Sequence, residues 1–104
     1  MKVYVTVSNL SNTINIFADD EANKITLNSK AIDYNAVDFV SRISMITFNW
    51  PTTNINNSVI DGEQYEIRLI ANNNQERKII GKNSFPSNYV DFSQLIHEVS
   101  NYGC

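Results

Sequence analysis

Apolar and polar residues alternate along the beginning of the chain, which is the pattern of half-buried β-strands. Valines at positions 3, 5 and 7 alternate with Tyr4 and Thr6. Two more alternating segments, 13–17 and 24–27, flank the polar turn at 19–23. Because successive side chains of a strand point to opposite faces, these segments predict three antiparallel strands with one shared apolar face.

The apolar spacing then changes to that of a helix. Asn35 is a suitable N-cap with Asp38 three residues later, as in a capping box, and Tyr34 and Phe39 are spaced as a hydrophobic staple. A proline three residues past Phe48 disfavours helical geometry, so we expect the helix to end near Phe48. The expected apolar stripe comprises Ala36, Phe39, Val40, Ile43, Ile46 and Trp50.

The second half of the chain repeats this order of elements. The polar segment 51–58 predicts a loop, and Asp61-Gly62 between strand formers predicts a hairpin. Segments 65–69 and 76–80 read as strands joined by a turn at 72–74. A second helix is expected after Pro86, with Gly103 as its C′ residue and the apolar stripe Tyr89, Phe92, Leu95, Ile96, Val99 and Tyr102.

The two halves align at one ungapped offset of 53 residues. This offset pairs Asn35 with Asn88 and Ile14 with Ile67, and it also superimposes both turns. The match favours a duplicated βββα unit with halves 1–52 and 53–104, related by a pseudo-twofold axis. The alternative is two units that share only their pattern of apolar and polar positions.

The elements together predict a single α+β domain. We expect an antiparallel sheet of five or six strands with both helices on one face, because alternating strands need a cover on their apolar side. The opposite face is polar enough for solvent and flat enough for a partner, and its expected residues are Tyr4, Thr6, Asn15, Thr26, Glu66, Arg68 and Lys78. Of these, Tyr4, Thr6, Arg68 and Lys78 are the candidate interaction residues.

Composition narrows the classes of function. The chain has 104 residues, 42% of them hydrophobic, and a formal net charge of −3. An acidic domain without a clustered positive field is a poor nucleic-acid or anionic-membrane binder. We find no apolar run of transmembrane length and no signal-peptide layout. The single cysteine, Cys104, suits a reducing cytoplasm.

The residue types that perform catalysis each have a structural explanation. His97 lies beside Ser93 on the helix face opposite the apolar stripe, which predicts a solvent-exposed histidine. Asp38 and Asp91 occupy the third helical position, where carboxylates favour the helix dipole. We therefore assign no catalytic, cofactor-binding or metal-binding residue and expect no cofactor.

Charged and aromatic residues elsewhere in the chain favour structural roles as well. The acidic run 19–21 reads as a solvated turn. Arg77 and Lys78 are expected on opposite sheet faces, which dilutes the only local basic cluster that they form with Lys82. For Trp50, closure of the core is favoured over a recognition hot spot.

One block of the second half carries a resemblance. The pattern DG-x-x-[WY]-x-I … G-x-N-x-[FY]-P followed by a helix, with an upstream Trp, matches Trp50, Asp61, Gly62, Tyr65, Gly81, Asn83, Phe85 and Pro86. It resembles a recurrent block in small uncharacterised bacterial proteins, in which Trp is as frequent as Tyr at the position of Tyr65. The resemblance implies a fold and a bacterial origin, and it implies no activity.

The sequence leaves three hypotheses of function. The first is a non-enzymatic cytoplasmic protein that binds a partner protein, of the immunity or mobile-element type. The second is a self-associating homodimer that pairs through an open sheet edge or face. The third is a small enzyme that uses carboxylates, which requires at least two acids to converge in one pocket.

Overall fold

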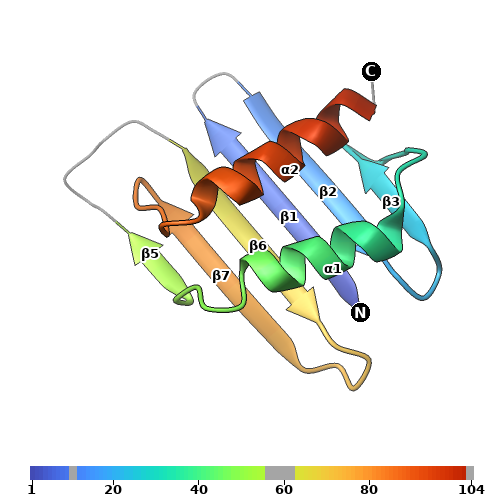
Figure 1. Cartoon of the computed structure of the whole chain (residues 1–104), viewed down its shortest axis with the longest axis horizontal. Helices are drawn as coiled ribbons and strands as arrows, with labels where there is room; N and C mark the ends of the chain where they lie inside the picture. The colour runs from blue at the N-terminus through green and yellow to red at the C-terminus, as the bar shows by residue number, and fades with distance from the viewer. Residues whose placement is uncertain (10–11, 56–62, 103–104) are drawn as a thin grey trace.

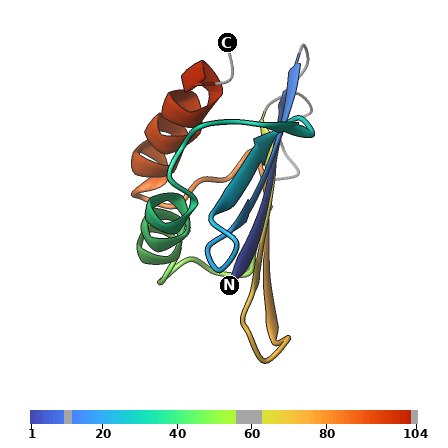
Figure 2. The same ribbon diagram turned by 90° about the vertical axis from the view of Figure 1, so that its right-hand side faces the viewer.

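The chain folds into two layers, a twisted sheet and a pair of helices that cover one of its faces (Figures 1 and 2). This computed structural model describes residues 1–9, 12–55 and 63–102. The expected α+β class and the placement of both helices on one face are confirmed. Within these residues the sheet has seven strands, so the expectation of five or six was too low.

The sheet is antiparallel apart from one pair. The strands are β1 (Lys2–Asn9), β2 (Asn12–Asp19), β3 (Lys24–Leu27), β4 (Lys30–Ala31), β5 (Thr53–Ile55), β6 (Gln64–Ile70) and β7 (Glu76–Lys82). Their order across the sheet is β4-β3-β2-β1-β6-β7-β5, and β5 runs parallel to β7.

The core lies between the sheet and the helices, and the strands contribute the apolar side chains of their helix-facing side to it. In the central strand β1, Val3, Val5 and Val7 are buried. Val5 pairs with Ile16 of β2 and with Ile67 of β6, so apolar side chains form continuous rows across the sheet. These buried rows fix the register, because a shift by one residue would turn every apolar side chain to solvent.

Two short edge strands account for the larger sheet. β4 was not expected, and β5 forms within the segment 51–58 that we predicted as a loop. β5 lies parallel to β7 opposite Ile80, Gly81 and Lys82, and the Ile80 N–H donates to the carbonyl of Thr52. An edge strand can form with polar side chains because its stability comes from backbone pairing, so alternation gave no signal.

The first helix, α1 (Ala36–Ile46), follows its sequence signals. The side chain of Asn35 accepts a hydrogen bond from the Asp38 N–H at 3.0 Å, and the Tyr34 and Phe39 rings contact edge to face. The helix ends two residues before Phe48, with Thr47 as its C-cap.

The second helix, α2 (Tyr89–Tyr102), buries the expected stripe of Phe92, Leu95, Ile96 and Val99. The predicted C′ residue Gly103, the Asp61-Gly62 hairpin and Cys104 lie outside the described residues.

The predicted pseudo-twofold axis is wrong. Since β1 is antiparallel to both β2 and β6, these two strands run parallel to each other. A twofold axis normal to the sheet would reverse one of them, and an axis along β1 would place the helices on opposite faces. Both helices lie on one face (Figure 2). The duplication itself remains a prediction.

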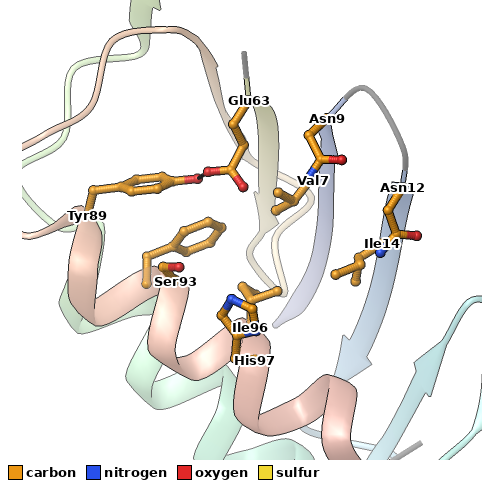
Figure 3. Close-up of a pocket in the computed structure, with 10 residues that line it drawn as sticks. Val7, Asn9, Asn12, Ile14, Glu63, Tyr89, Ser93, Ile96 and His97 are labelled. Carbon is orange, nitrogen blue, oxygen red and sulfur yellow. Dashed lines mark hydrogen bonds between the residues drawn. The ribbon is translucent and has the colours of Figure 1, made fainter. Parts of the chain in front are cut away.

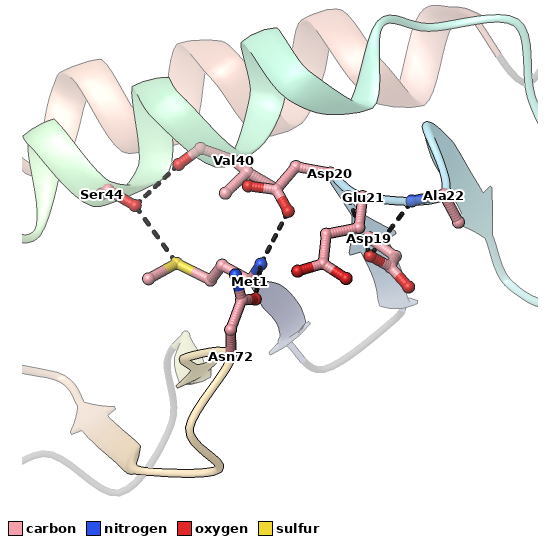
Figure 4. A network of polar contacts seen from close by, with 8 residues as sticks. All are labelled: Met1, Asp19, Asp20, Glu21, Ala22, Val40, Ser44 and Asn72. Atoms are coloured by element: carbon pink, nitrogen blue, oxygen red, sulfur yellow. Dashed lines mark hydrogen bonds and ion pairs between the residues drawn. The ribbon is translucent and has the colours of Figure 1, made fainter.

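Two turns and the amino group of Met1 meet at one end of the sheet (Figure 4). The amino group donates to Asp20 Oδ1 at 2.6 Å and to Asn72 Oδ1 at 2.8 Å. Asp20 belongs to the β2–β3 turn and Asn72 to the β6–β7 turn. The acidic run that we read as a solvated turn therefore also joins two hairpins.

Candidate functional site

The outer face, which is the sheet face opposite the helices, brings together all four candidate interaction residues. Tyr4 of β1 pairs directly with Arg68 of β6, and Arg68 pairs with Lys78 of β7. Thr6 follows Tyr4 on the same side of β1. Among the described residues, no helix covers this face (Figure 2).

Aromatic and charged side chains hold one another in place on the outer face. The Tyr4 and Phe17 ring centroids lie 4.8 Å apart, and the Arg68 guanidinium lies 5.0 Å from the centroid of Tyr4. Arg68 forms an ion pair with Glu76 across the β6–β7 hairpin. Exposed pairs of this kind add little stability, so their main effect is to order side chains that remain accessible.

The outer face is positively charged although the chain is acidic. Strand register places five of the eight basic residues there, namely Lys2, Lys24, Arg68, Lys78 and Lys82. Of the ten acidic residues that the structure describes, the same register places three there, namely Asp19, Glu66 and Glu76. The strand residues of this face therefore carry an excess of two positive charges, against a net charge of −3 for the chain. As expected, Arg77 and Lys78 lie on opposite faces of the sheet, and Lys78 is the one on the outer face.

Three motif residues, Trp50, Tyr65 and Phe85, lie on the other side of the sheet in an aromatic cluster with Tyr89 and Phe92. Tyr65 is at its centre, with ring centroids 5.8 Å from Trp50, 6.1 Å from Phe85 and 5.1 Å from Tyr89. Trp50 and Tyr65 are both buried. The prediction that Trp50 closes the core is confirmed.

Gly81 makes room for this cluster, and Asn83 and Pro86 direct the backbone around it. A Cβ atom on Gly81 would lie 1.9 Å from Tyr65 Cζ, so only glycine fits beneath the ring. Asn83 adopts a left-handed φ of 56°, which turns the chain away from the sheet. The carbonyl of Pro86 accepts a hydrogen bond from the Tyr89 N–H at the start of α2. Asp61 and Gly62 lie outside the described residues.

Two polar side chains link the end of α1 to the rest of the cluster. Asn88 accepts a hydrogen bond from Trp50 Nε1 at 2.6 Å and donates one to the Ile46 carbonyl at 2.8 Å. Arg77 donates to the carbonyls of Thr47 and Trp50. Asn88 was expected to resemble the N-cap Asn35, but its side chain binds these groups instead.

A small cavity of about 120 Å³ opens between α2 and one end of the sheet (Figure 3). Its apolar floor is formed by Val7, Ile14, Phe92 and Ile96, and its polar groups come from Asn9, Asn12, Glu63, Tyr89, Ser93 and His97. Tyr89 Oη donates a hydrogen bond to the Glu63 carboxylate. Burial, and then this hydrogen bond, raises the pKa of Tyr89 above that of an ordinary tyrosine.

His97 is exposed, as expected, but it does not lie opposite the apolar stripe. It lines the cavity together with Phe92 and Ile96 (Figure 3). Sequence reasoning missed this site, although Tyr89, Ser93 and His97 recur every four residues and so follow one another along the helix. Glu63 is the only carboxylate among the described residues of the cavity lining.

The fold and its surfaces define a two-layer α+β domain with one uncovered, positively charged sheet face. No family model, curated protein or solved structure matches the chain. Within residues 1–9, 12–55 and 63–102, no three His, Cys, Asp or Glu side chains gather into a metal-binding group. None of the helices in those ranges has the length and apolar character required to cross a membrane.

Proposed function

We propose that this chain is a non-enzymatic cytoplasmic accessory protein that binds an acidic surface of a partner protein through the outer face of its sheet. The observation that carries the proposal is the positive charge of this uncovered face in an otherwise acidic chain. Complementary charge speeds association and selects the correct partner more than it adds affinity.

The residues at the centre of the face have the chemistry of interface residues. Tyrosine and arginine are enriched among side chains that contribute most to binding, because each combines a large contact area with polar groups. Tyr4 and Arg68 lie against each other near the middle of the sheet, flanked by Phe17 and Lys78. Their ordering by Glu76 and Phe17 lowers the entropy lost when a partner docks.

Charge also favours a different protein over a second copy of this chain. Two copies stacked through their outer faces would bring together two surfaces that each carry a positive excess. An acidic partner would instead gain favourable interactions with Lys2, Lys24, Arg68, Lys78 and Lys82. Self-association through this face is therefore the weaker hypothesis, and light scattering that shows a monomer at high concentration would be consistent with this ranking.

The test compares two variants of equal charge change. Tyr4→Ser combined with Lys78→Glu alters the outer face, where Lys78 is 50% exposed. Val37→Ser combined with Lys30→Glu alters exposed residues away from this face and serves as the matched control. Each chain is used as bait in a lysate of cells that express the protein, at low and high salt.

We expect the wild type and the control to retain the same partner, with retention that weakens as salt increases, and the outer-face variant to lose it. Equal retention by both variants, or a partner held only by the outer-face variant, would contradict the proposal. Failure of the wild type to retain any partner under gentle lysis would also count against it. Circular dichroism of each variant checks that the fold is unchanged.

A further inference from the structure

The cavity under α2 has features that the proposed interface does not use. It combines an apolar floor with the carboxylate of Glu63, and it lies between the sheet and the helix rather than on the outer face (Figure 3). Its volume of about 120 Å³ suits a molecule of a few heavy atoms. An engineered apolar cavity of about 150 Å³ in another protein holds benzene.

Glu63 has unused capacity to accept hydrogen bonds. A carboxylate offers about four acceptor positions, and Tyr89 Oη fills one of them. No Lys or Arg among the described residues forms an ion pair with Glu63. A half-buried carboxylate without a counter-ion favours a cationic ligand and disfavours an anionic one.

The remaining groups of the cavity suit an organic cation. Tyr89 and Phe92 line the cavity together with Glu63, their ring centroids lie 5.3 Å apart, and aromatic rings attract ammonium groups. Val7, Ile14 and Ile96 form an apolar floor against which a short hydrocarbon tail can pack. Ser93 and His97 add hydrogen-bonding groups to the lining.

We propose that this cavity binds a small primary alkylammonium ion, with its nitrogen on Glu63 and its alkyl tail on the apolar floor. The ammonium group donates to the free positions of the Glu63 carboxylate, and Tyr89 keeps that carboxylate oriented. The inference concerns a different surface from the proposed function and does not depend on it.

The test is a titration of the ¹⁵N-labelled protein with n-butylammonium, followed by NMR. We expect saturable shifts of the amide signals of Ser93, Ile96 and His97. The neutral analogue n-butanol and the anion butyrate, which have similar tails, should give no saturable shift at the same concentrations. Similar responses to all three compounds, or no saturable response to n-butylammonium, would overturn the proposal.

A substitution isolates the role of the carboxylate. Glu63→Gln keeps the size of the side chain and an acceptor for Tyr89 but removes the charge, so affinity for n-butylammonium should fall by about tenfold or more. Glu66→Gln on the outer face removes the same charge elsewhere and should leave affinity unchanged. Equal affinity of wild type and Glu63→Gln, with both folded by circular dichroism, would overturn the proposal.

Two further titrations complete the test. The first distinguishes a free amine from a peptide as the ligand, and the second distinguishes binding in the cavity from binding on the outer face. A short peptide with one lysine presents the same ammonium group on a longer chain, and a shift with the peptide but not with n-butylammonium would contradict a free amine as the ligand. The outer-face variant Tyr4→Ser/Lys78→Glu should bind n-butylammonium as the wild type does, whatever it does to the partner protein.

Discussion

Replacing Gly81 with alanine should destabilise the fold through a single steric conflict. The added Cβ would lie 1.9 Å from Tyr65 Cζ and 2.4 Å from Tyr65 Oη, far inside van der Waals contact. Tyr65 is 2% exposed and is surrounded by four aromatic rings. Its hydroxyl also donates to the carbonyl of Ser84 at 3.0 Å. The ring therefore cannot tilt away without losing these contacts.

The cost follows from three contributions. Overpacking of a core costs about 1–3 kcal/mol, and loss of the Tyr65–Ser84 hydrogen bond adds about 1 kcal/mol. Alanine is otherwise better than glycine in a strand by about 0.5–1 kcal/mol. The net loss is about 2 kcal/mol, which lowers Tm by roughly 8–16 °C for a domain of this size.

Thermal and urea unfolding followed by circular dichroism measure this loss. Lys82→Ala, the next residue on the same strand, controls for ordinary surface effects and should stay within about 0.5 kcal/mol of wild type. In a Tyr65→Val background the ring is absent, so Gly81→Ala should become neutral or stabilising. The reasoning is refuted if Gly81→Ala is as stable as wild type, or if it costs the same in both backgrounds.

Three further predictions concern the hydrogen bonds of Asn88 and the dependence of stability on the pKa values of Glu98 and Tyr65. Asn88→Ala should cost about 2 kcal/mol, because it removes two hydrogen bonds and leaves Trp50 Nε1 unpaired, and the tryptophan fluorescence should change with it. The hydrogen bond from Tyr34, and to a smaller extent that from Arg42, lowers the pKa of Glu98 below its ordinary value of 4.5. These hydrogen bonds therefore stabilise the fold above pH 4.5, where the carboxylate is charged in both the folded and the unfolded chain. The Tm difference between wild type and Glu98→Gln should shrink as the pH falls below that value, and a constant difference would contradict this. Burial raises the pKa of Tyr65 from 10.0 to about 12, so stability should fall as the pH rises through this interval, and a Tm that stays constant across it would contradict this.

The features that the sequence predicts correctly depend on neighbours along the chain. The valines of β1 alternate because one face of the strand is buried, and Asn35 caps α1 through an N–H only three residues away. The placement of Arg68 and Lys78 on the outer face likewise follows from alternation within each strand. Such signals are local, so they can be read without knowing the fold.

The features that the sequence does not predict depend on long-range pairing. β1 lies between β2 and β6, and this position rules out the predicted twofold axis. No local pattern in the sequence shows which strands will be neighbours in the sheet. The edge strand β5 carries no alternation at all. The cavity was missed because Glu63 and His97 come from distant segments that approach only after the helix packs on the sheet.

Lysine acetylation with mass spectrometry tests the proposed interface most directly, because four of the five lysines project from the outer face. In the complex with the captured partner, Lys2, Lys24, Lys78 and Lys82 should react more slowly than in the free chain. Lys30 lies at the edge strand β4, off this face, and should react equally in both. Protection of Lys30 alone, with the other four lysines as reactive as in the free chain, would contradict an interface on the outer face.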